Sequence, residues 1–599
     1  MSAEGDLPVA GPLAPNRNVL AARTLLDELA RWGVSHICLS PGSRSAPLAL
    51  AAHADPRLTV TVHTDERSGG FYALGLARAS ERPVALVCTS GSAGAHYLPA
   101  VVEASASRIP LVVLTADRPP TLLDAGAPQT MDQPELLAPY VRFRDAIGTP
   151  EPTGTWLRWL RARVGRAMEA GADGHPGPVH LNVHFDEPLN ADLVAGDVPD
   201  ALGTDLLALR GQPGGAPFAP VVRGRTTLGG PALAAVRARL FAAERPVVVA
   251  GPQAGRGALT LAVGLGAPLL ADPMSGLRCP GAPVVSGYDA FLRSPAVQAR
   301  LAPDLVVHVG RTPTCKHIGL WLERHLGVAR FVVDPSPDRE DPHHLGSTYV
   351  RVDPETFANA VGMRPELPPS RWLLRWLDAE VAVRAARNRA IREAPTGFEG
   401  SLIAALERSW TPDARLLVAS SMPVRQLDAF WEGGPQEVFA NRGVNGIDGL
   451  VSTAFGTAAA DPSRSVWAIL GDLALLHDLG GLAAAERGAP PVVFVVVNNG
   501  GGGIFRYLPL ANTAAAEPGG AFEPLFLTPH QTRFEAAARL FGLDFAQPST
   551  TAELRDALQA PTQRSRLVEL VVDREDSVAR HKAFWADVEQ RVLDLLEGA

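Results

Sequence analysis

Between residues 465 and 505, two short apolar runs rich in β-branched residues flank a segment with helical character. The first run, 466–470, ends at Gly-Asp, and the second, 491–497, ends at Asn-Asn-Gly-Gly. Apolar runs of this length, bounded by Gly and Pro, are typical of buried parallel strands joined by a crossover helix. In such a sheet, ligands bind beyond the carboxyl ends of the strands. The pattern therefore predicts one β–α–β step with polar side chains at a ligand-binding edge.

The residues that follow the two runs supply the chemistry of this edge. Asp472 and Asn499 offer side-chain oxygens, and Gly501 offers a backbone carbonyl that no side chain shields. Mg²⁺ prefers oxygen ligands in an octahedral shell, which it usually completes with water and substrate phosphates. We interpret these residues as part of a magnesium site. The alternative is an ordinary strand end followed by a glycine-rich hairpin.

The same edge resembles the Gly-Asp…Asn-Asn signature of thiamine diphosphate (ThDP) enzymes, in which the metal anchors the diphosphate of the cofactor. Gly471, Asp472 and Asn499 match that signature, whereas Leu473 stands where Gly is usual. The resemblance implies ThDP as the cofactor, held through Mg²⁺, with Mn²⁺ as the alternative metal.

Strand, polar turn and helix alternate along most of the chain. A chain of 599 residues is too long for a single core, and three domains are the natural expectation. The rhythm predicts an α/β protein of three doubly wound α/β domains, and the resemblance implies that they are of the ThDP-enzyme type. We expect an N-terminal pyrimidine-binding domain at 1–190, a linker at 191–230, a central α/β domain at 231–365 and a C-terminal diphosphate- and metal-binding domain at 366–599.

Charge and composition narrow the class of protein. The formal net charge of −8 argues against binding nucleic acid or an anionic membrane as the main task. No apolar run is long enough for a transmembrane helix, and residues 1–15 lack the pattern of a secretory signal. The four cysteines are dispersed without metal-ligand spacing, as in a reduced cytoplasmic protein. We expect a cytoplasmic location.

In the first third, four predicted strands each end at polar residues, which is typical of the active edge of a doubly wound sheet. Glu66 stands where the second of these strands passes into a helix. A carboxylate bonded to the pyrimidine nitrogen of ThDP favours the tautomer that acts as a base, and a glutamate here suits that task. The alternative is a glutamate that only stabilises the helix N-terminus.

Four ordered motifs make the resemblance more specific. They are Ser-Pro-Gly-Ser-Arg-Ser at 40–45, Asp-Glu-Arg at 65–67, Thr-Ser-Gly at 89–91 and Leu-Thr-Ala-Asp-Arg-Pro-Pro at 114–120. Together they look like the 2-succinyl-5-enolpyruvyl-6-hydroxy-3-cyclohexene-1-carboxylate (SEPHCHC) synthase family of menaquinone biosynthesis. The resemblance implies a transferase with Glu66 as its catalytic residue. The cofactor-binding positions that it implies are Ser90, Gly91, Ser92, Ile447 (the wedge that bends ThDP), Gly471, Asp472 and Asn499.

This family implies that 2-oxoglutarate loses CO₂ on ThDP and that the resulting carbanion adds to isochorismate in a conjugate (1,4) addition. We expect the 2-oxoglutarate chain to bind mainly at Ser421, Arg425 and Arg442, because the arginine fork grips carboxylates. Isochorismate would bind mainly at Ser43, Arg44, Arg118, Gln129 and Lys316, and Ile504, Phe505 and Leu508 would form an apolar wall over the reacting carbon.

The resemblance also implies a homodimer or homotetramer with the active site between subunits, where Glu66 and Asp472 would meet. Two positions depart from the family pattern. His317 stands where relatives often have arginine, and His96 stands where they tend to have asparagine. We interpret His96 as a core or interface residue, with a place at the cofactor's edge as the alternative.

Two rival functions remain open from the sequence. The first is another ThDP enzyme, such as a 2-oxoacid decarboxylase or an acetolactate synthase, which would not need so many carboxylate-binding arginines. The second is a catalytically silent ThDP-fold subunit, which the presence of Glu66, Asp472 and Asn499 disfavours.

Overall fold

The structure is a computed structural model that describes residues 13–172, 174–365, 371–411, 413–434, 437–517, 519–560 and 563–598. Residues 1–12, which belong to the segment 1–15 where the sequence shows no secretory signal, lie outside these residues. The expected domain boundary at 366 lies outside them as well. The chain forms two compact units, residues 1–223 with 442–461, and residues 224–441 with 462–599. None of the described helices is long and apolar enough to cross a bilayer.

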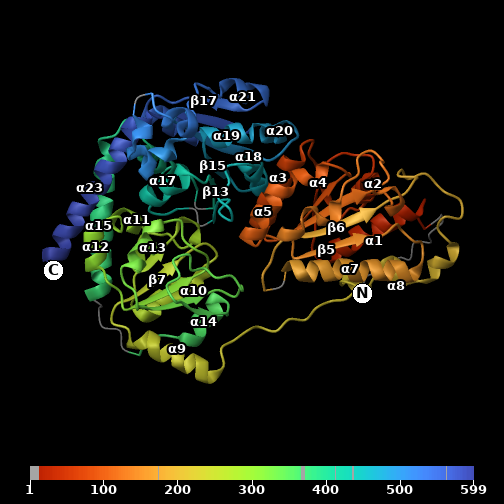
Figure 1. Ribbon diagram of the computed structural model, residues 1–599, viewed down its shortest axis with the longest axis horizontal. Coiled ribbons are helices and arrows are strands. Elements are labelled where there is room, and N and C mark those ends of the chain that lie inside the picture. Colours follow the sequence, from red (N-terminus) through yellow and green to blue (C-terminus); the bar gives the residue numbers. More distant parts are fainter. Residues whose placement is uncertain are drawn as a thin grey trace. The chain divides into compact units, whose positions relative to one another are not determined.

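The first unit contains a six-stranded sheet in the order β2-β1-β3-β4-β6-β5, and every neighbouring pair of strands is parallel (Figure 1). Its central strands consist of buried, mostly β-branched or leucine residues, as helices on both faces require. The strands are β1 (His36–Leu39), β2 (Thr59–Val62), β3 (Val84–Cys88), β4 (Leu111–Asp117), β5 (Phe143–Ile147) and β6 (Val179–His184).

The helices of this unit include one segment from far along the chain. Helix α18 (Leu450–Ala459) packs on α3 (Glu66–Ser80), and the two approach so closely that small residues are needed at the contact. A Cβ at Gly75 would lie 2.1 Å from the carbonyl oxygen of Thr453, and one at Gly456 would lie 1.9 Å from that of Tyr72. The other α-helices are α1 (Arg17–Arg31), α2 (Ala46–Ala54), α4 (Ala93–His96), α5 (Leu98–Ser107), α6 (Gln133–Leu136), α7 (Gly154–Ala172) and α8 (Leu206–Arg210).

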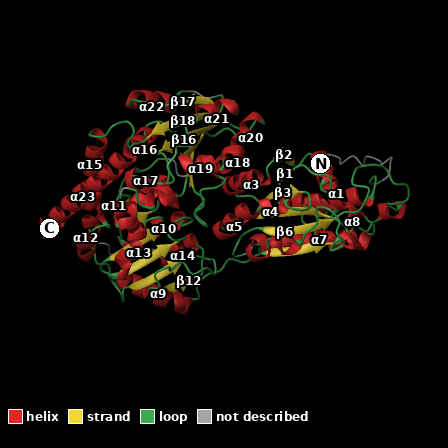
Figure 2. Cartoon of the chain, turned by 45° about the horizontal axis from the view of Figure 1, so that its top comes forward, coloured by secondary structure: helices red, strands yellow, loops and turns green. Residues whose placement is uncertain are grey.

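The second unit contains two further six-stranded parallel sheets. The middle one has the order β12-β11-β10-β7-β8-β9, with β7 (Pro246–Ala250) and β10 (Leu305–Val309) at its centre and fully buried. In Figure 2 the label β12 marks one edge of this sheet, whose strands are drawn in yellow. The other strands are β8 (Leu269–Ala271), β9 (Val284–Val285), β11 (Ala329–Val333) and β12 (Thr348–Val350). The helices around it are α9 (Gly230–Ala242), α10 (Gly255–Leu265), α11 (Tyr288–Phe291), α12 (Pro295–Arg300), α13 (Lys316–Glu323) and α14 (Pro354–Val361).

The third sheet has the order β14-β13-β15-β16-β18-β17. Strands β15 (Val466–Gly471) and β16 (Val492–Asn498) are adjacent and parallel, with Gly471 opposite Val497. The remaining strands are β13 (Arg415–Val418), β14 (Glu437–Phe439), β17 (Asp544–Ala546) and β18 (Arg566–Val571). The helices are α15 (Arg371–Arg392), α16 (Glu399–Glu407), α17 (Met422–Phe430), α19 (Asp472–His477), α20 (Ala483–Glu486), α21 (Glu535–Leu540), α22 (Thr551–Gln559) and α23 (Arg574–Gly598).

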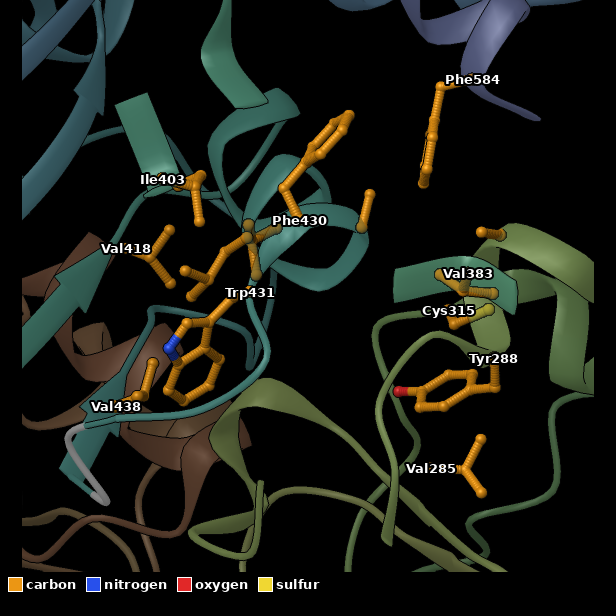
Figure 3. Close-up of a cluster of buried hydrophobic side chains, with 14 of the residues drawn as sticks. Val285, Tyr288, Cys315, Val383, Ile403, Val418, Phe430, Trp431, Val438 and Phe584 are labelled. Atoms are coloured by element: carbon orange, nitrogen blue, oxygen red, sulfur yellow. The ribbon is translucent and has the colours of Figure 1, made fainter. Parts of the chain in front are cut away.

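One continuous apolar cluster joins the two sheets of the second unit. It includes Tyr288 and Cys315 from the middle region, Val383 from α15, and Phe430 and Phe584 from the C-terminal region (Figure 3). Aromatic pairs lie within it, with ring centroids 5.6 Å apart for Trp321 and Trp376 and 4.9 Å apart for Phe430 and Phe584, and large aromatic side chains bury much apolar area. Because α11, α13 and α17 all contribute side chains to this cluster, it positions the cavity that these helices line.

The expected fold class is confirmed, since three parallel sheets with interleaved helices occur in the expected regions. At the sheet margins, the strands β5, β9, β12 and β17 are not marked by long apolar runs in the sequence. Each of these is an edge strand, is short or partly exposed, and therefore lacks a long apolar run. The exact domain boundaries stay a prediction.

Candidate functional site

The expected metal-binding residues converge at the carboxyl edge of the third sheet. Asp472 is the first residue of α19, directly after β15, and only 3% of its surface is exposed. Its Oδ1 accepts a hydrogen bond from the backbone N–H of Leu473 at 2.7 Å, and its Oδ2 accepts one from Gly501 at 2.9 Å. Burial raises the pKa of this carboxyl, against the effect of those two hydrogen bonds. A cation beside Asp472 would offset this cost of desolvation.

The turn after β16 is shaped by its glycines. Gly501 has φ of +140°, and a Cβ there would lie 2.2 Å from the carbonyl oxygen of Leu527. Only glycine fits such a position without strain. The Gly501 carbonyl accepts a hydrogen bond from the N–H of Gly503 at 2.9 Å, and a carbonyl oxygen has a second lone pair for another partner.

Asn499 provides the clearest test of whether these residues fit a bound group. Its Oδ1 is buried and has no hydrogen-bond partner among the described residues. A buried acceptor without a partner is costly, and an oxygen ligand for a cation is one way to satisfy it. The Nε2 atom of His530 lies 3.3 Å from Oδ2 of Asp472, so the site also has a histidine that the sequence pattern did not indicate. The residues present fit a divalent metal.

A second group of expected residues lines a cavity in the same unit. Lys316, Arg425, Ile504 and Leu508 surround a space of about 150 Å³. They come from α13, α17 and the turn that follows β16, which are far apart in the sequence. Phe505 instead packs against Phe526, with ring centroids 5.6 Å apart. Cationic and apolar side chains thus line the same small cavity.

The start of α17 combines a strained backbone at Ser421 with a partly desolvated arginine, Arg425. Ser421 has φ of +71°, a left-handed conformation that a side chain rarely adopts. Its carbonyl oxygen accepts a hydrogen bond from Nη1 of Arg425. Burial lowers the pKa of the Arg425 guanidinium, while Asp289 and Asp428 act in the opposite direction. An anionic ligand would favour the charged form of this arginine.

In the first unit, three of the expected residues make direct contact. Nη1 of Arg118 donates to the hydroxyl of Ser90 at 2.6 Å and to the carbonyl of Gln129 at 2.9 Å. Gln129, whose φ is +62°, donates in turn to the carbonyl of Ser90 at 3.1 Å. The carboxyl edge of the first sheet therefore places these polar groups together.

A buried network beneath them was not foreseen from the sequence. Oε1 of Gln133 accepts from the N–H of Gly91 at 2.7 Å, and its Nε2 donates to Oδ1 of Asn182 at 2.8 Å. Asn182 also donates to Oδ2 of Asp117 at 2.9 Å. Gln133 and Asn182 are fully buried. No motif marks these residues, because the network exists only once β4, β6 and α6 are adjacent.

The other expected residues of this unit occupy turns and helix ends. Glu66 begins α3 and is half-buried, and Ile447 is half-buried shortly before α18. Arg44 donates to the carbonyl of Phe185 at 3.1 Å, and burial is the main cause that lowers its pKa. His96 is exposed, so the expectation of a core histidine is wrong. Its place at an interface stays a prediction. Ser92 and Ser43 are exposed, and Arg442 is half-buried.

Comparison with known proteins decides between the families left open. Residues 20–136 match the N-terminal TPP binding domain of thiamine pyrophosphate enzymes, TPP being another name for ThDP. Residues 233–418 match their middle domain, and residues 420–572 match their C-terminal TPP binding domain. A SEPHCHC synthase of Halobacterium salinarum is 41% identical over 581 residues, which cover 94% of this chain and 97% of the relative. The chain belongs to the SEPHCHC synthase family.

Other relatives agree. SEPHCHC synthases of Geobacillus kaustophilus (38% identical, covering 96% of this chain and 99% of the relative) and Myxococcus xanthus (41%, covering 95% and 97%) also match over nearly their whole length. The family consists of ThDP-dependent transferases of menaquinone biosynthesis, so the expected enzyme class is confirmed, as is ThDP as the cofactor. The expected metal stays a prediction. The two rival functions are thereby set aside.

Proposed function

We propose that this enzyme decarboxylates 2-oxoglutarate and joins the remaining four-carbon unit to isochorismate by conjugate (1,4) addition, giving SEPHCHC and CO₂. The observation that carries the proposal is the cavity where Lys316 and Arg425 face Ile504 and Leu508. Both substrates are dicarboxylates, and a half-buried arginine whose pKa is lowered by desolvation suits a carboxylate partner. The apolar wall would keep water from the reacting carbon.

The proposed metal ligands are Asp472, Asn499 and the carbonyl of Gly501, with Mg²⁺ as the first choice and Mn²⁺ as the second. Support comes from the buried oxygen of Asn499 and from the contact between Gly501 and Asp472. When bound, ThDP supplies the carbanion chemistry that decarboxylation requires. The chain's own part is to fix the metal, to keep the edge of the sheet shielded from water and to bind the substrate carboxylates.

We assign to Glu66 the task of holding a proton at the pyrimidine nitrogen of the cofactor. Its place at the first turn of α3, half-buried above the carboxyl ends of the strands, supports this role. Ser90, Gly91, Ser92 and Ile447 are proposed to contact the cofactor. The two arginine sets are proposed to divide the substrates as the resemblance implies, with Ser421, Arg425 and Arg442 serving 2-oxoglutarate.

We further propose that the active enzyme is a homodimer or homotetramer in which the Glu66 of one subunit serves the Asp472 of another. A cytoplasmic location stays a prediction from the sequence. Sedimentation of active enzyme tests the assembly, since a fully active monomer would refute it.

A direct assay tests the reaction. The purified enzyme with Mg²⁺ and ThDP should consume isochorismate only when 2-oxoglutarate is present, as followed by the loss of isochorismate absorbance. Turnover with pyruvate in place of 2-oxoglutarate, and none with 2-oxoglutarate, would contradict the proposal. Glu66→Gln should lower kcat by about 10²–10⁴-fold, the usual contribution of a positioned acid or base. It should retain ThDP affinity, and a loss confined to affinity would refute the assigned role.

A further inference from the structure

A second cluster of potential metal ligands lies in the wall of the same cavity, apart from the Asp472 site. Asp289 on α11 meets Cys315 and His317 at the start of α13, and each is at least nine-tenths buried. Among the described residues, this is the group of three His, Cys, Asp or Glu side chains whose ligand atoms all lie within 4.8 Å of one another. The family resemblance assigns no metal to these residues.

The distances within the cluster suit a single small ion. Sγ of Cys315 lies 3.0 Å from Oδ1 of Asp289 and 3.9 Å from Nδ1 of His317, and that nitrogen lies 3.1 Å from the same Asp289 oxygen. For tetrahedral Zn²⁺, with bonds of about 2.3 Å to sulfur and about 2.0–2.2 Å to nitrogen and oxygen, the ligand atoms would be about 3.3–3.6 Å apart. Shifts of a few tenths of an ångström would therefore complete the geometry.

Neighbouring residues orient the side chains of the proposed metal ligands. The second oxygen of Asp289, Oδ2, accepts from Nη2 of Arg293 at 2.7 Å, which fixes the carboxylate while Oδ1 faces the cluster. Arg293 is itself held over the ring of Trp585, 3.8 Å from its centroid. Cys315 belongs to the apolar cluster of Figure 3, so its thiol is fixed by packing. Outer partners that orient ligands in this way are a general feature of metal sites.

We propose that Asp289, Cys315 and His317 form a binding site for a soft divalent cation, Zn²⁺, with a fourth coordination position open to the cavity. A thiolate and an imidazole favour Zn²⁺ and disfavour Mg²⁺, which requires an octahedral shell of oxygens. All three residues line the cavity that also contains Lys316 and Arg425, so water or an anionic oxygen would take the fourth position. Three protein ligands with one open position are typical of accessible zinc sites.

The protons balance simply. On binding, the S–H bond of Cys315 breaks, its proton leaves to solvent, and the sulfur lone pair forms the bond to the metal. The Nδ1–H that His317 now donates to Asp289 must also move: the neutral imidazole passes through solvent exchange to the tautomer that carries its proton on Nε2, which frees the lone pair of Nδ1 for the metal, and Asp289 binds as a carboxylate. The hydrogen bond that the Cys315 thiol now donates to Asp289 is replaced by the shared ion.

Direct metal binding tests the site. Chelator-treated full-length enzyme, kept in excess Mg²⁺, is titrated with Co²⁺ as a spectroscopic probe and with Zn²⁺ by calorimetry. The wild-type protein should take up one equivalent and show a thiolate-to-Co²⁺ charge-transfer band. Cys315→Ser should abolish the band and weaken Zn²⁺ affinity by about 10–100-fold. Cys279→Ser, which removes the exposed thiol, is the matched control and should change neither.

Absence of the band in the wild-type protein, or its loss in Cys279→Ser and not in Cys315→Ser, would overturn the proposal. X-ray absorption on the Zn²⁺-loaded wild-type enzyme gives a readout that does not depend on any variant folding. One sulfur and otherwise nitrogen or oxygen neighbours are expected, and a shell of oxygen alone would refute the site. Neither measurement involves turnover, so the outcome is independent of the proposed reaction.

Discussion

The carboxyl edges of the first and third sheets have the same architecture, yet their polar groups are used in opposite ways. At the first sheet, the hydroxyl of Ser90 accepts from Arg118, its carbonyl accepts from Gln129, and the side chain of Gln133 accepts from the N–H of Gly91, so these polar groups have partners within the protein. At the third sheet, Asn499 keeps a buried oxygen without a partner, and Asp472 is buried at a cost. The polar groups named at the first edge are held by the protein itself, whereas the third edge leaves a buried acceptor for which a ligand is proposed.

Because of this difference, a substitution at the first edge should lower stability, whereas a substitution at the third edge should lower ligand affinity. Removing a side chain from an internally satisfied network leaves buried groups unpaired and lowers stability. Removing one that has no protein partner leaves the fold intact and lowers ligand affinity instead.

The largest effect is expected at the third sheet. Asn499→Ala should weaken binding of ThDP with Mg²⁺ by about 100-fold, because an oxygen ligand is lost. The free energy of unfolding without cofactor should change by less than about 1 kcal/mol, since Oδ1 has no partner to lose. Calorimetric titration and chemical denaturation measure the two quantities. A large loss of stability with unchanged affinity would show that Asn499 stabilises the fold and does not bind the metal.

Gln133→Leu at the first sheet should show the opposite behaviour. The substitution leaves the N–H of Gly91 without this acceptor and removes the bonds from Gln133 to Oδ1 of Asn182, which keeps the hydroxyl of Thr115, and to the carbonyl of Ala116. This should lower the free energy of unfolding by about 2–3 kcal/mol. Glu135→Gln on the same helix is the control: its side chain is exposed, and it should cost less than about 0.5 kcal/mol. If both variants lowered the free energy of unfolding equally, the network around Gln133 would not contribute to stability as proposed.

The first unit should also lose stability in mild acid. Burial lowers the pKa of His180 to about 4, with Arg144 as a smaller cause. The unfolded state, with a histidine pKa of about 6.5, binds more protons between these values, so the stability that neutral His180 provides is present above pH 6.5 and lost as pH falls toward 4. Between pH 7 and pH 5 this amounts to about 2 kcal/mol. His180→Asn should flatten the pH profile of unfolding, and His53→Asn at the surface should not.

The smallest effect is expected for one carboxylate contact in the cavity. Arg425→Ala should raise KM for 2-oxoglutarate about tenfold, the equivalent of one charge-assisted pair, and raise KM for isochorismate much less. Arg425→Lys keeps the charge but loses the planar fork, so its effect should be intermediate. Steady-state kinetics with each substrate varied in turn measures the ratio. An equal change for both substrates would undo the proposed division.

Many features of this protein can be predicted from short segments of its sequence. The buried strands β15 and β16, the glycine turn at Gly501 and the polar strand ends are visible as runs and motifs, because apolar periodicity and glycine conformation are short-range properties. The family motifs then fixed the fold class and the enzyme family. The edge strands β9 and β17 were out of reach, since short strands take their conformation from the neighbour with which they pair.

The tertiary structure decided which side chains share a site. Gln133 meets Asn182, Asp289 meets Cys315 and His317, and His530 approaches Asp472 only because parallel strands bring distant segments to a common edge. Burial and the strained backbone of Ser421 are likewise properties of packing. The sequence determined the identity of the reactive groups, whereas packing determined their neighbours and hence the free energy of their charges, because desolvation and hydrogen bonding depend on what surrounds a side chain in space.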